Sequence, residues 1–366
     1  MIRRPLKIAF LFFLLAIPWL QNCSYGEVRA MWITRYQIDS KPKIDRFIKD
    51  ASDNGFNTLV VQVLGRGVAY YDSSLIPKYE FGFDPLAYTV EKSHNTGLKV
   101  IAWLNTYYVW SSPEAPSFRD HVVNLHPDWV ISEGNMKYLN PALPPVRDYL
   151  YAVYAEVASK YKVDGIHFDY VRYPNAYSGM DYGSRRTFSN SYWLDPVLLF
   201  NDPSAVKQYY GNIGFRKLRD RWSDYRSSQV TGLLERIYKG IKAINSSIEV
   251  SAAVLADSDS AKRENGQDWI LWVKKGIIDK IYPMAYTEDL TRFNKLVRRA
   301  AAGTRKPVVV VGFGAYKNTP QELIKQIKLY RYYGYRFQSL AGICLFSYDS
   351  IASDREYLPV INRNAF

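Results

Sequence analysis

Short apolar runs of strand type alternate with longer amphipathic runs of helix type along most of this chain. The predicted strands are apolar and rich in β-branched or aromatic residues, and they cover 28–34, 56–65, 98–107, 163–171, 248–256, 280–287, 307–315 and 339–349. The predicted helices cover 41–55, 84–97, 145–161, 229–244, 268–279, 291–303 and 319–334. Such alternation is typical of a parallel sheet covered on both faces. Eight strands in this pattern predict the α/β class and a (β/α)8 TIM barrel.

A doubly wound open sheet is the alternative fold for an alternating chain. That fold favours a glycine-rich turn after the first strand, and residues 34–40 read TRYQIDS, without glycine. The connections after the second, third and fourth strands are long, as expected of loops on the rim of a barrel. The longest, about 175–228, shows no core of its own in the sequence. We therefore expect one domain, 27–366, with an insertion that shapes a groove.

The first 26 residues are predicted to be a signal peptide. Basic residues precede an apolar run over 8–20, which is too short to span a bilayer as a helix. Residues 20–23 read LQNC and resemble a lipoprotein box, in which case the signal would be 1–22 and Cys23 would carry a lipid. Asn22 departs from that box, and ordinary cleavage near Gly26 is the alternative. We expect an exported protein, either periplasmic or membrane-anchored through Cys23, or else secreted.

The composition bears on the partners of the chain. The formal net charge is +13, which would suit an anionic partner. The basic residues are spread through predicted helices (Arg298, Arg299, Lys325 and Lys328, for example), a pattern typical of solvated faces, so no nucleic-acid partner is expected. Aromatic residues make up 16% of the chain, which favours a carbohydrate partner, although a tyrosine-rich core would give the same figure.

Carboxylates lie at the ends of four predicted strands, where TIM barrels place their chemistry. Alternation along each strand predicts which side chains face the barrel axis. The residues expected there are Gln62, Trp103, Asn105, His167, Asp169, Asp257, Tyr286, Glu288 and Asp349. Paired carboxylates in an aromatic cleft are typical of glycoside hydrolysis, in which one group protonates the leaving oxygen and the other attacks the sugar or activates water.

Asp169 and Glu288 are the predicted catalytic pair. Arg172 lies three residues after Asp169 and should favour its ionised form, which suits a nucleophile or base. Glu288 would then be the acid, with Asp257 and Asp349 as the next candidates, and a retaining reaction is favoured. Arg172 would also hold anionic groups of the substrate. Each residue has a structural alternative: an Asp169–Arg172 ion pair, helix capping by Asp257 or Glu288, or a place in the core for His167.

No metal or other cofactor is predicted. The four histidines (94, 121, 126 and 167) show no ligand spacing, and there is no cluster of Cys and His. An amidase or deacetylase on the same barrel would need such a site. Cys23 and Cys344 are the only cysteines and do not indicate a disulfide framework.

Five segments of the chain resemble the bacterial glycosyl-hydrolase-like family 10: RAMWIT, GFNTLVVQV, KVIAWLNTY, YKVDGIHFDYVRYP and IYPMAYT. The resemblance runs from Val28 to Asp349. It implies an exported or lipid-anchored TIM-barrel hydrolase that acts on cell-wall glycan, in particular peptidoglycan strands without peptide stems. Within the motif FDYVRYP it marks Asp169 most strongly. His167, Arg172 and Tyr173, which lie close to Asp169 in the sequence, are expected to contact the substrate.

The fourth strand also resembles chitinase-type barrels, whose motif is Asp-Gly-x-Asp-x-Asp-x-Glu. Val171 stands where that motif has its catalytic Glu, which excludes the usual chitinase mechanism. The segment PMAY resembles the Met-x-Tyr of those barrels and favours substrate contact by Tyr286. A non-catalytic carbohydrate- or wall-binding protein on a degenerate barrel is the alternative function. A glycosidase requires a second carboxylate within reach of Asp169, whereas the binding protein does not.

Overall fold

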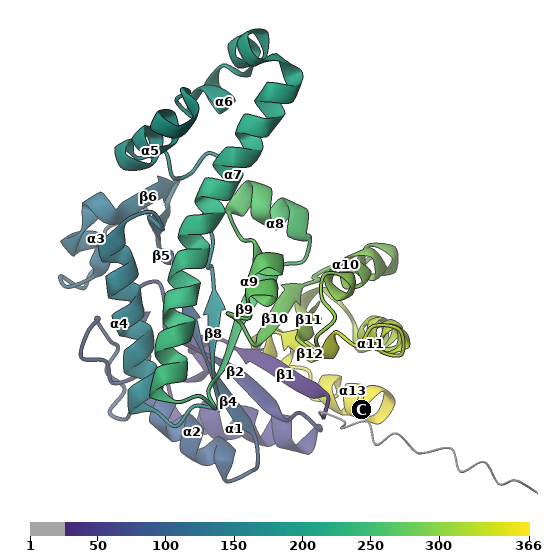
Figure 1. Cartoon of the computed structure of the whole chain (residues 1–366). Coiled ribbons are helices and arrows are strands. Elements are labelled where there is room, and N and C mark those ends of the chain that lie inside the picture. The colour runs from purple at the N-terminus through teal and green to yellow at the C-terminus, as the bar shows by residue number, and fades with distance from the viewer. Residues whose placement is uncertain (1–25) are drawn as a thin grey trace, which may run out of the picture.

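Eight parallel strands close into a barrel in the computed structural model, which describes residues 26–366 (Figure 1). The barrel strands are β1 (Val28–Ile33), β2 (Thr58–Gly65), β4 (Lys99–Asn105), β8 (Gly165–Asp169), β9 (Glu249–Leu255), β10 (Lys280–Met284), β11 (Val309–Gly314) and β12 (Leu340–Phe346). Each pairs with its neighbours, and β1 pairs with both β2 and β12, which closes the barrel. The predicted (β/α)8 barrel is confirmed. The predicted signal peptide and the lipidation of Cys23 lie outside the described residues.

Helices surround the barrel where the amphipathic runs predicted them. They are α1 (Lys41–Asp53), α2 (Pro85–His94), α4 (Pro144–Lys160), α7 (Pro203–Ile244), α9 (Trp269–Lys275), α10 (Leu290–Ala302) and α11 (Pro320–Gly334). Two more, α12 (Tyr348–Ile351) and α13 (Tyr357–Ala365), follow the last strand, and α13 packs against α11. Their apolar faces form the main core with the outward-facing strand residues. Within residues 26–366, no helix is long and apolar enough to cross a membrane.

The barrel interior has its own core of aromatic and small side chains. Trp32, Trp103 and Tyr282 fill it together with smaller residues from the other strands. His167 lies in this layer, where its Nδ1 is 2.9 Å from the Ser251 hydroxyl and its Nε2 accepts a 3.4 Å hydrogen bond from the Trp32 indole. Burial lowers the pKa of His167 to about 3, so the ring is neutral at physiological pH. His167 is therefore a core residue beneath the mouth of the barrel.

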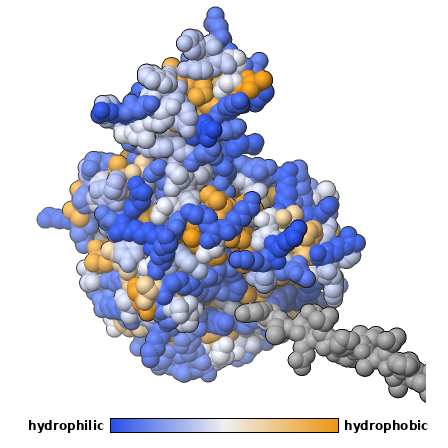
Figure 2. All heavy atoms as spheres, in the orientation of Figure 1, coloured by the Kyte–Doolittle hydropathy of each residue, from blue (hydrophilic) through white to orange (hydrophobic). Residues whose placement is uncertain are grey.

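Two connections on the rim carry extra structure. After β4, the strands β5 (Tyr108–Ser111), β6 (Val130–Glu133) and β7 (Met136–Leu139) form a small antiparallel sheet, with α3 (Val122–Leu125) between β5 and β6. After β8, the chain forms α5 (Tyr182–Tyr192), α6 (Leu198–Asn201) and the first half of α7. These three helices stand off the barrel as an arm, which we call the helical arm (Figures 1 and 2).

The helical arm has a core of its own, which corrects the expectation that the insertion lacks one. Phe188, Leu199 and Trp222 are almost fully buried in it. Three further buried residues, Leu194, Val206 and Leu218, belong to the same core, and partly buried hydrophobic residues pack against it. The sequence hides this core because α7 is one helix of 42 residues, interrupted only at Gly211, whose first half serves the arm and whose second half covers the barrel. Apolar residues of α7 that belong to the core of the arm are therefore followed directly by apolar residues that belong to the main core of the barrel.

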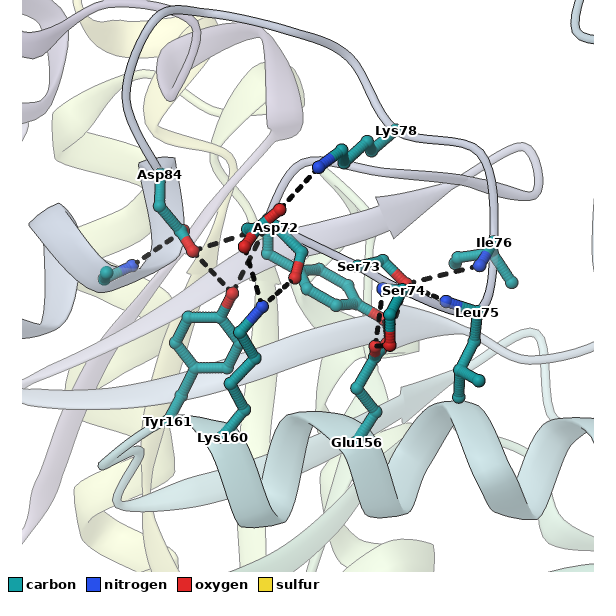
Figure 3. Close-up of polar contacts among 12 residues, drawn as sticks. Asp72, Ser73, Ser74, Leu75, Ile76, Lys78, Asp84, Glu156, Lys160 and Tyr161 are labelled. Atoms are coloured by element: carbon teal, nitrogen blue, oxygen red, sulfur yellow. Dashed lines mark hydrogen bonds and ion pairs between the residues drawn. The ribbon is translucent and has the colours of Figure 1, made fainter.

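The connection between β2 and α2 is fixed to the end of α4 by a polar network (Figure 3). It begins with β3 (Val68–Ala69), which pairs with the end of β2. The Glu156 carboxylate then accepts hydrogen bonds from the Ser73 hydroxyl at 2.7 Å, from the Ser74 amide at 2.7 Å and from the Tyr71 hydroxyl at 3.1 Å. Burial raises the pKa of Glu156, but these hydrogen bonds outweigh it, and the pKa is lowered.

Replacing Glu156 by Gln is expected to destabilise the fold by about 1–3 kcal/mol at neutral pH, because hydrogen bonds to a charged acceptor are lost. A folded-state pKa below the unfolded value means that this contribution is present above the unfolded pKa and lost as pH falls through the folded one. The difference in the free energy of unfolding between wild type and Glu156→Gln should therefore become smaller toward pH 3. Urea unfolding at pH 7 and pH 3 measures it. Glu91→Gln on the exposed side of α2 is the control, and an equal loss in both would contradict the role of Glu156.

Candidate active site

Asp169 is the last residue of β8, at the carboxyl end of the barrel. Its neighbour Tyr170 has a φ of 49°, a left-handed conformation that is uncommon outside glycine and tends to occur at functional sites. This turn brings the Tyr170 amide to within 2.6 Å of the Asp169 carboxylate. The side chain of Asp169 is 11% exposed, so the carboxyl group lies in a largely dry position at the barrel mouth.

Arg172 is the ionic partner of Asp169, as the sequence predicts, but it does not determine the protonation of the carboxyl group. The two groups are 4.0 Å apart. Burial raises the pKa of Asp169, and the opposing effects of the Arg172 charge, the Tyr170 amide and the Trp103 indole do not cancel it. Arg172 favours the ionised form of Asp169, as expected, but burial outweighs it, so the pKa of Asp169 is raised. A carboxyl group with a raised pKa suits a proton donor.

Arg172 lies within a set of stacked aromatic rings on one side of the mouth. Its guanidinium lies over the Tyr170 ring, 4.7 Å from the centroid. Tyr170 stacks on Tyr108, with centroids 4.6 Å apart, and Tyr138 lies against both rings. The Nη1 atom of Arg172 is buried and has no hydrogen-bond partner among the described residues. The Nη1 group of Arg172 therefore lies next to Asp169 with its hydrogen-bonding capacity unused.

A second aromatic set forms the opposite side of the mouth. Tyr286 stacks on Phe346, with centroids 5.3 Å apart, and Tyr316 packs edge-on to both. Tyr316 is 51% exposed, so this set runs from the barrel interior to solvent. Tyr286 also packs against the interior core, with its ring centroid 6.3 Å from that of Trp32. Tyr286 is therefore at the mouth, as predicted.

A chain of polar side chains connects the first strands to this space. Gln62 accepts a hydrogen bond from the Arg35 guanidinium at 3.2 Å and donates one to Asn105 at 3.3 Å. Asn105 also accepts from the Trp103 indole at 3.1 Å, and it is the register partner of Asp169 on the neighbouring strand. The predicted residues Gln62, Trp103 and Asn105 thus all line the interior next to Asp169. These hydrogen bonds hold the Gln62 and Asn105 amides and the Arg35 guanidinium in place, and such groups can donate hydrogen bonds to sugar hydroxyls.

Glu288 lies in the connection between β10 and α10, exposed to solvent. The residues before it are held firmly, because the Thr287 carbonyl accepts a 2.8 Å hydrogen bond from Gln326. Asp289, just after it, caps α10 through the amides of Thr291 and Arg292. Among the described residues, the Glu288 carboxylate makes no hydrogen bond or ion pair of its own. It is therefore an unengaged carboxylate on the connection that follows β10.

The other two candidate carboxylates are engaged in structural contacts. Asp257 caps α8 (Ser258–Asn265) through the Ser260 amide and forms an ion pair with Arg299. Asp349 accepts hydrogen bonds from the Thr34 hydroxyl at 2.7 Å and from Gln37 at 3.0 Å. Both residues hold rim segments together. The structure therefore leaves Glu288 as the one free carboxylate among the three predicted partners of Asp169.

The expectation for the eighth strand was wrong in phase. β12 ends at Phe346, and the side chains that face the barrel axis are Cys344 and Phe346. Ser347 caps α12, and Asp349 lies in the first turn of that helix instead of on a strand. The strand is shorter than predicted because the apolar run continues directly into a helix without a turn residue.

Tyr173 is not a substrate contact in this structure, which corrects the prediction. Its ring is fully buried beneath the Arg226 guanidinium, 4.6 Å from the centroid. Its backbone amide donates to the Asn265 carbonyl at 2.9 Å, and its own carbonyl accepts from the Asn265 side chain at 3.0 Å. Tyr173 therefore anchors the loop after β8 to α7 and to α8.

Several residues of the mouth were missed by the sequence analysis. Arg35, Tyr108, Tyr170, Tyr316 and Phe346 belong to it. Tyr170 carried a signal, since it lies inside the motif FDYVRYP. Phe346 was missed because the phase of β12 was predicted wrongly, and the others lie on rim connections whose course the strand pattern does not predict. Among residues 26–366, no group of three or more His, Cys, Asp or Glu side chains is arranged to hold a metal ion.

Comparison with known proteins gives the family. The profile of the family described as Glycosyl hydrolase-like 10 matches residues 27–328. The chain is 26% identical to the glycosyl hydrolase YngK of Bacillus subtilis, over 87% of this chain and 68% of YngK. It is also 26% identical to the glycosyl hydrolase DigH of Escherichia coli, over 72% of this chain. That match spans 61% of DigH, so these relatives are longer than the region shared with this chain.

Solved structures agree on the fold. The glycoside hydrolase domain of PgaB from Bordetella bronchiseptica matches with a TM-score of 0.67 at 14% identity, over 93% of this chain and 99% of that one. The catalytic domain of a β-amylase from Paenibacillus polymyxa matches with a TM-score of 0.57 at 14% identity, over 92% and 98%. At these identities the likeness is one of fold, a TIM barrel.

Proposed function

We propose that this chain, which belongs to the glycosyl hydrolase-like 10 family, is an exported hydrolase of a bacterial cell-wall or other polysaccharide glycan. Peptide-free peptidoglycan strands are the first substrate to test. The observation that carries the proposal is the place of Asp169: a dry carboxyl group at the barrel mouth, between two aromatic sets. Aromatic faces suit sugar rings, and a carboxyl group with a raised pKa suits the protonation of a leaving oxygen.

The two carboxylates are assigned opposite roles to those expected from the sequence. Asp169 is assigned as the proton donor, because burial raises its pKa from the usual value of an aspartic acid. Glu288 is the group that attacks the sugar or activates water, because solvent reaches it and no other side chain engages it. The bond between the anomeric carbon and the leaving oxygen breaks as Asp169 gives its proton to that oxygen. Glu288, directly or through water, supplies the electron pair at the anomeric carbon.

The test is the release of reducing ends from peptide-free glycan strands and from other wall polysaccharides. The proposal expects new reducing ends that increase with time and enzyme. A non-catalytic wall-binding protein, the alternative, would co-sediment with the polymer and release none. Export is tested separately, by mass spectrometry of the protein from its own host. A chain that begins at Met1 would refute export, and a diacylglyceryl group on Cys23 would establish anchoring.

Replacing Arg172 by Ala is expected to move the basic limb of the kcat/KM profile to higher pH. The Arg172 charge is the largest effect that lowers the pKa of Asp169 against burial, so its removal raises that pKa further and the proton is held more tightly. If the guanidinium also holds an anionic substituent, KM should rise more than kcat falls. The pH dependence of kcat/KM for wild type, Arg172→Ala and Arg172→Lys measures both effects. A basic limb that stays in place in Arg172→Ala would contradict the coupling of Arg172 to Asp169.

A further inference from the structure

The positive charge of this chain is concentrated in one segment. Residues 290–337 contain eleven Lys or Arg and a single acidic residue, Glu322. This segment therefore carries ten of the thirteen net positive charges of the chain. It consists of α10, β11, α11 and their connections, and the two helices lie side by side on one flank of the barrel (Figure 1). The basic residues are solvated, as expected, but the acidic residues that balance them elsewhere in the chain are nearly absent from this segment.

The two helices form one surface. The Tyr333 hydroxyl of α11 donates a 2.6 Å hydrogen bond to Asn294 of α10, which fixes the helices against each other. Buried residues such as Phe293 and Ile327 hold their inner faces on the barrel. The basic residues of this surface lie on the exposed sides of the two helices and in the connections that follow them, and all but Arg331 are exposed to solvent. We call this surface the basic flank, and its charged members are Arg292, Lys295, Arg298, Arg305, Lys306, Lys325, Lys328 and Arg336.

Most of this charge is not neutralised within the protein. Arg299 pairs with Asp257, and Arg331 pairs with Glu27 at 2.9 Å. Within residues 26–366, the eight charged members of the basic flank form no ion pair. Like charges held together on two adjacent helices repel one another, so the arrangement costs stability unless an anionic surface compensates it.

Exposed tyrosines lie at the C-terminal end of the same flank. Tyr335 is 93% exposed and Tyr332 is 51% exposed, with the Arg336 guanidinium 5.0 Å from the Tyr332 centroid. Tyrosine next to Lys and Arg is the combination that proteins place at the level of lipid head groups. This favours a lipid surface over a soluble polyanion, for which charge alone would suffice.

The start of the described chain lies at this end of the flank. Gly26 and Glu27 line a hollow of about 940 Å³ together with Lys306, Arg331 and Tyr335. Glu27 is also the ionic partner of Arg331. Cys23, the predicted site of lipid attachment, precedes Gly26 by three residues in the sequence. An anchor at that position would bring the basic flank to the bilayer.

We propose that the basic flank binds the surface of an anionic phospholipid membrane. The helices run along the side of the barrel, so a membrane on this flank leaves the mouth with Asp169 open. The proposal concerns α10 and α11 and does not depend on hydrolysis or on lipidation of Cys23. Each Lys or Arg close to an anionic bilayer contributes about fivefold in affinity, so four such residues contribute on the order of 100-fold or more.

The test is partition of the full chain into vesicles, with Cys23→Ser in every protein so that no acyl chain can be attached. Vesicles are either phosphatidylcholine alone or phosphatidylcholine with about one third phosphatidylglycerol, a fraction that gives a negative surface potential. Since the apolar run 8–20 could bind lipid of any charge, the measured quantity is the ratio of anionic to neutral partition. Lys295→Gln, Arg298→Gln, Lys325→Gln and Lys328→Gln are combined in the test variant.

The control variant removes the same number of charges from the helical arm. It combines Arg186→Gln, Arg216→Gln, Lys217→Gln and Arg221→Gln, all exposed and outside any ion pair of the described chain. We expect the ratio to fall on the order of 100-fold in the flank variant and to change little in the arm variant. It should also fall in 0.5 M salt, which screens the surface charge.

Three outcomes would overturn the proposal. One is a wild-type ratio near one. Another is an equal loss in both variants, which would mean that net charge, and not the flank, governs binding. The third is vesicle binding unaffected by the flank variant while binding to soluble polyphosphate is lost, which would identify a polymer as the partner. Circular dichroism of each variant checks that the helices remain folded.

Discussion

Replacing Asp169 by Asn is expected to lower kcat on the natural glycan by about 10²–10⁴-fold, the contribution of a positioned general acid. The amide keeps the size of the side chain but cannot give a proton to the leaving oxygen. It also removes a buried carboxyl group, so the variant should fold at least as well as the wild type. Initial rates of reducing-end release, with protein stability measured in parallel, check both expectations.

Asp148→Asn is the matched control for this variant. Asp148 lies on the outer side of α4 and pairs with Arg236, away from the barrel mouth. Its replacement should leave kcat unchanged. Near-normal turnover in Asp169→Asn would remove Asp169 from the mechanism, whereas a loss that is matched by Asp148→Asn would reflect a general effect on the fold.

Replacing Glu288 by Gln is expected to cause the second large loss of activity. If Glu288 activates water, kcat should fall by about 10²–10⁴-fold, and if Glu288 attacks the sugar, kcat should fall further. A small anion such as azide should restore product formation in Glu288→Ala by taking the place of the lost carboxylate. The anomeric configuration of the sugar that the wild type first releases distinguishes retention from inversion, whereas the azide product is inverted in either case, because the anion attacks from the face that the missing group served.

Glu264→Gln is the control, because Glu264 is an exposed Glu at the end of α8 whose side chain makes no hydrogen bond among the described residues. Full activity in Glu288→Gln would mean that another group supplies the electron pair. Asp257 and Asp349 are poor substitutes, because each already holds a rim segment in place.

Much of the barrel could be predicted because backbone geometry links periodicity to structure. Side chains alternate along a strand whatever its neighbours are, so the inward phase of Gln62, Asn105, Asp169 and Tyr286 followed from position alone. The same reasoning failed at the eighth strand, where the apolar run passes into α12 and the phase changes at Phe346. Strand ends are set by tertiary packing as much as by sequence.

The protonation of Asp169 could not be predicted because burial is a property of the whole fold. In the sequence, the visible influence on Asp169 is the arginine three positions away. In the structure, burial outweighs that charge and reverses the direction of the pKa shift. The role expected for the carboxyl group changes with it, from base to acid.

The basic flank and the core of the helical arm were missed for a related reason. Arg298 and Lys328 lie 30 residues apart, and only the packing of α10 against α11 brings their helices onto one surface. In α7, the helix that follows the interruption at Gly211 contributes to two cores, so its apolar residues show no boundary between them. Tyr173 looked like part of the site because it lies in the motif, and the structure turns it inward beneath Arg226.

The central claim is that Asp169 donates a proton to the leaving oxygen, and leaving-group dependence tests it most directly. The measurement compares kcat/KM of wild type and Asp169→Asn on the glycan and on an aryl glycoside of the same sugar whose leaving group departs without a proton. The account predicts a loss of about 10²–10⁴-fold on the glycan and a far smaller loss on the aryl glycoside. An equal loss on both substrates would contradict it, because that result identifies Asp169 as the nucleophile or base.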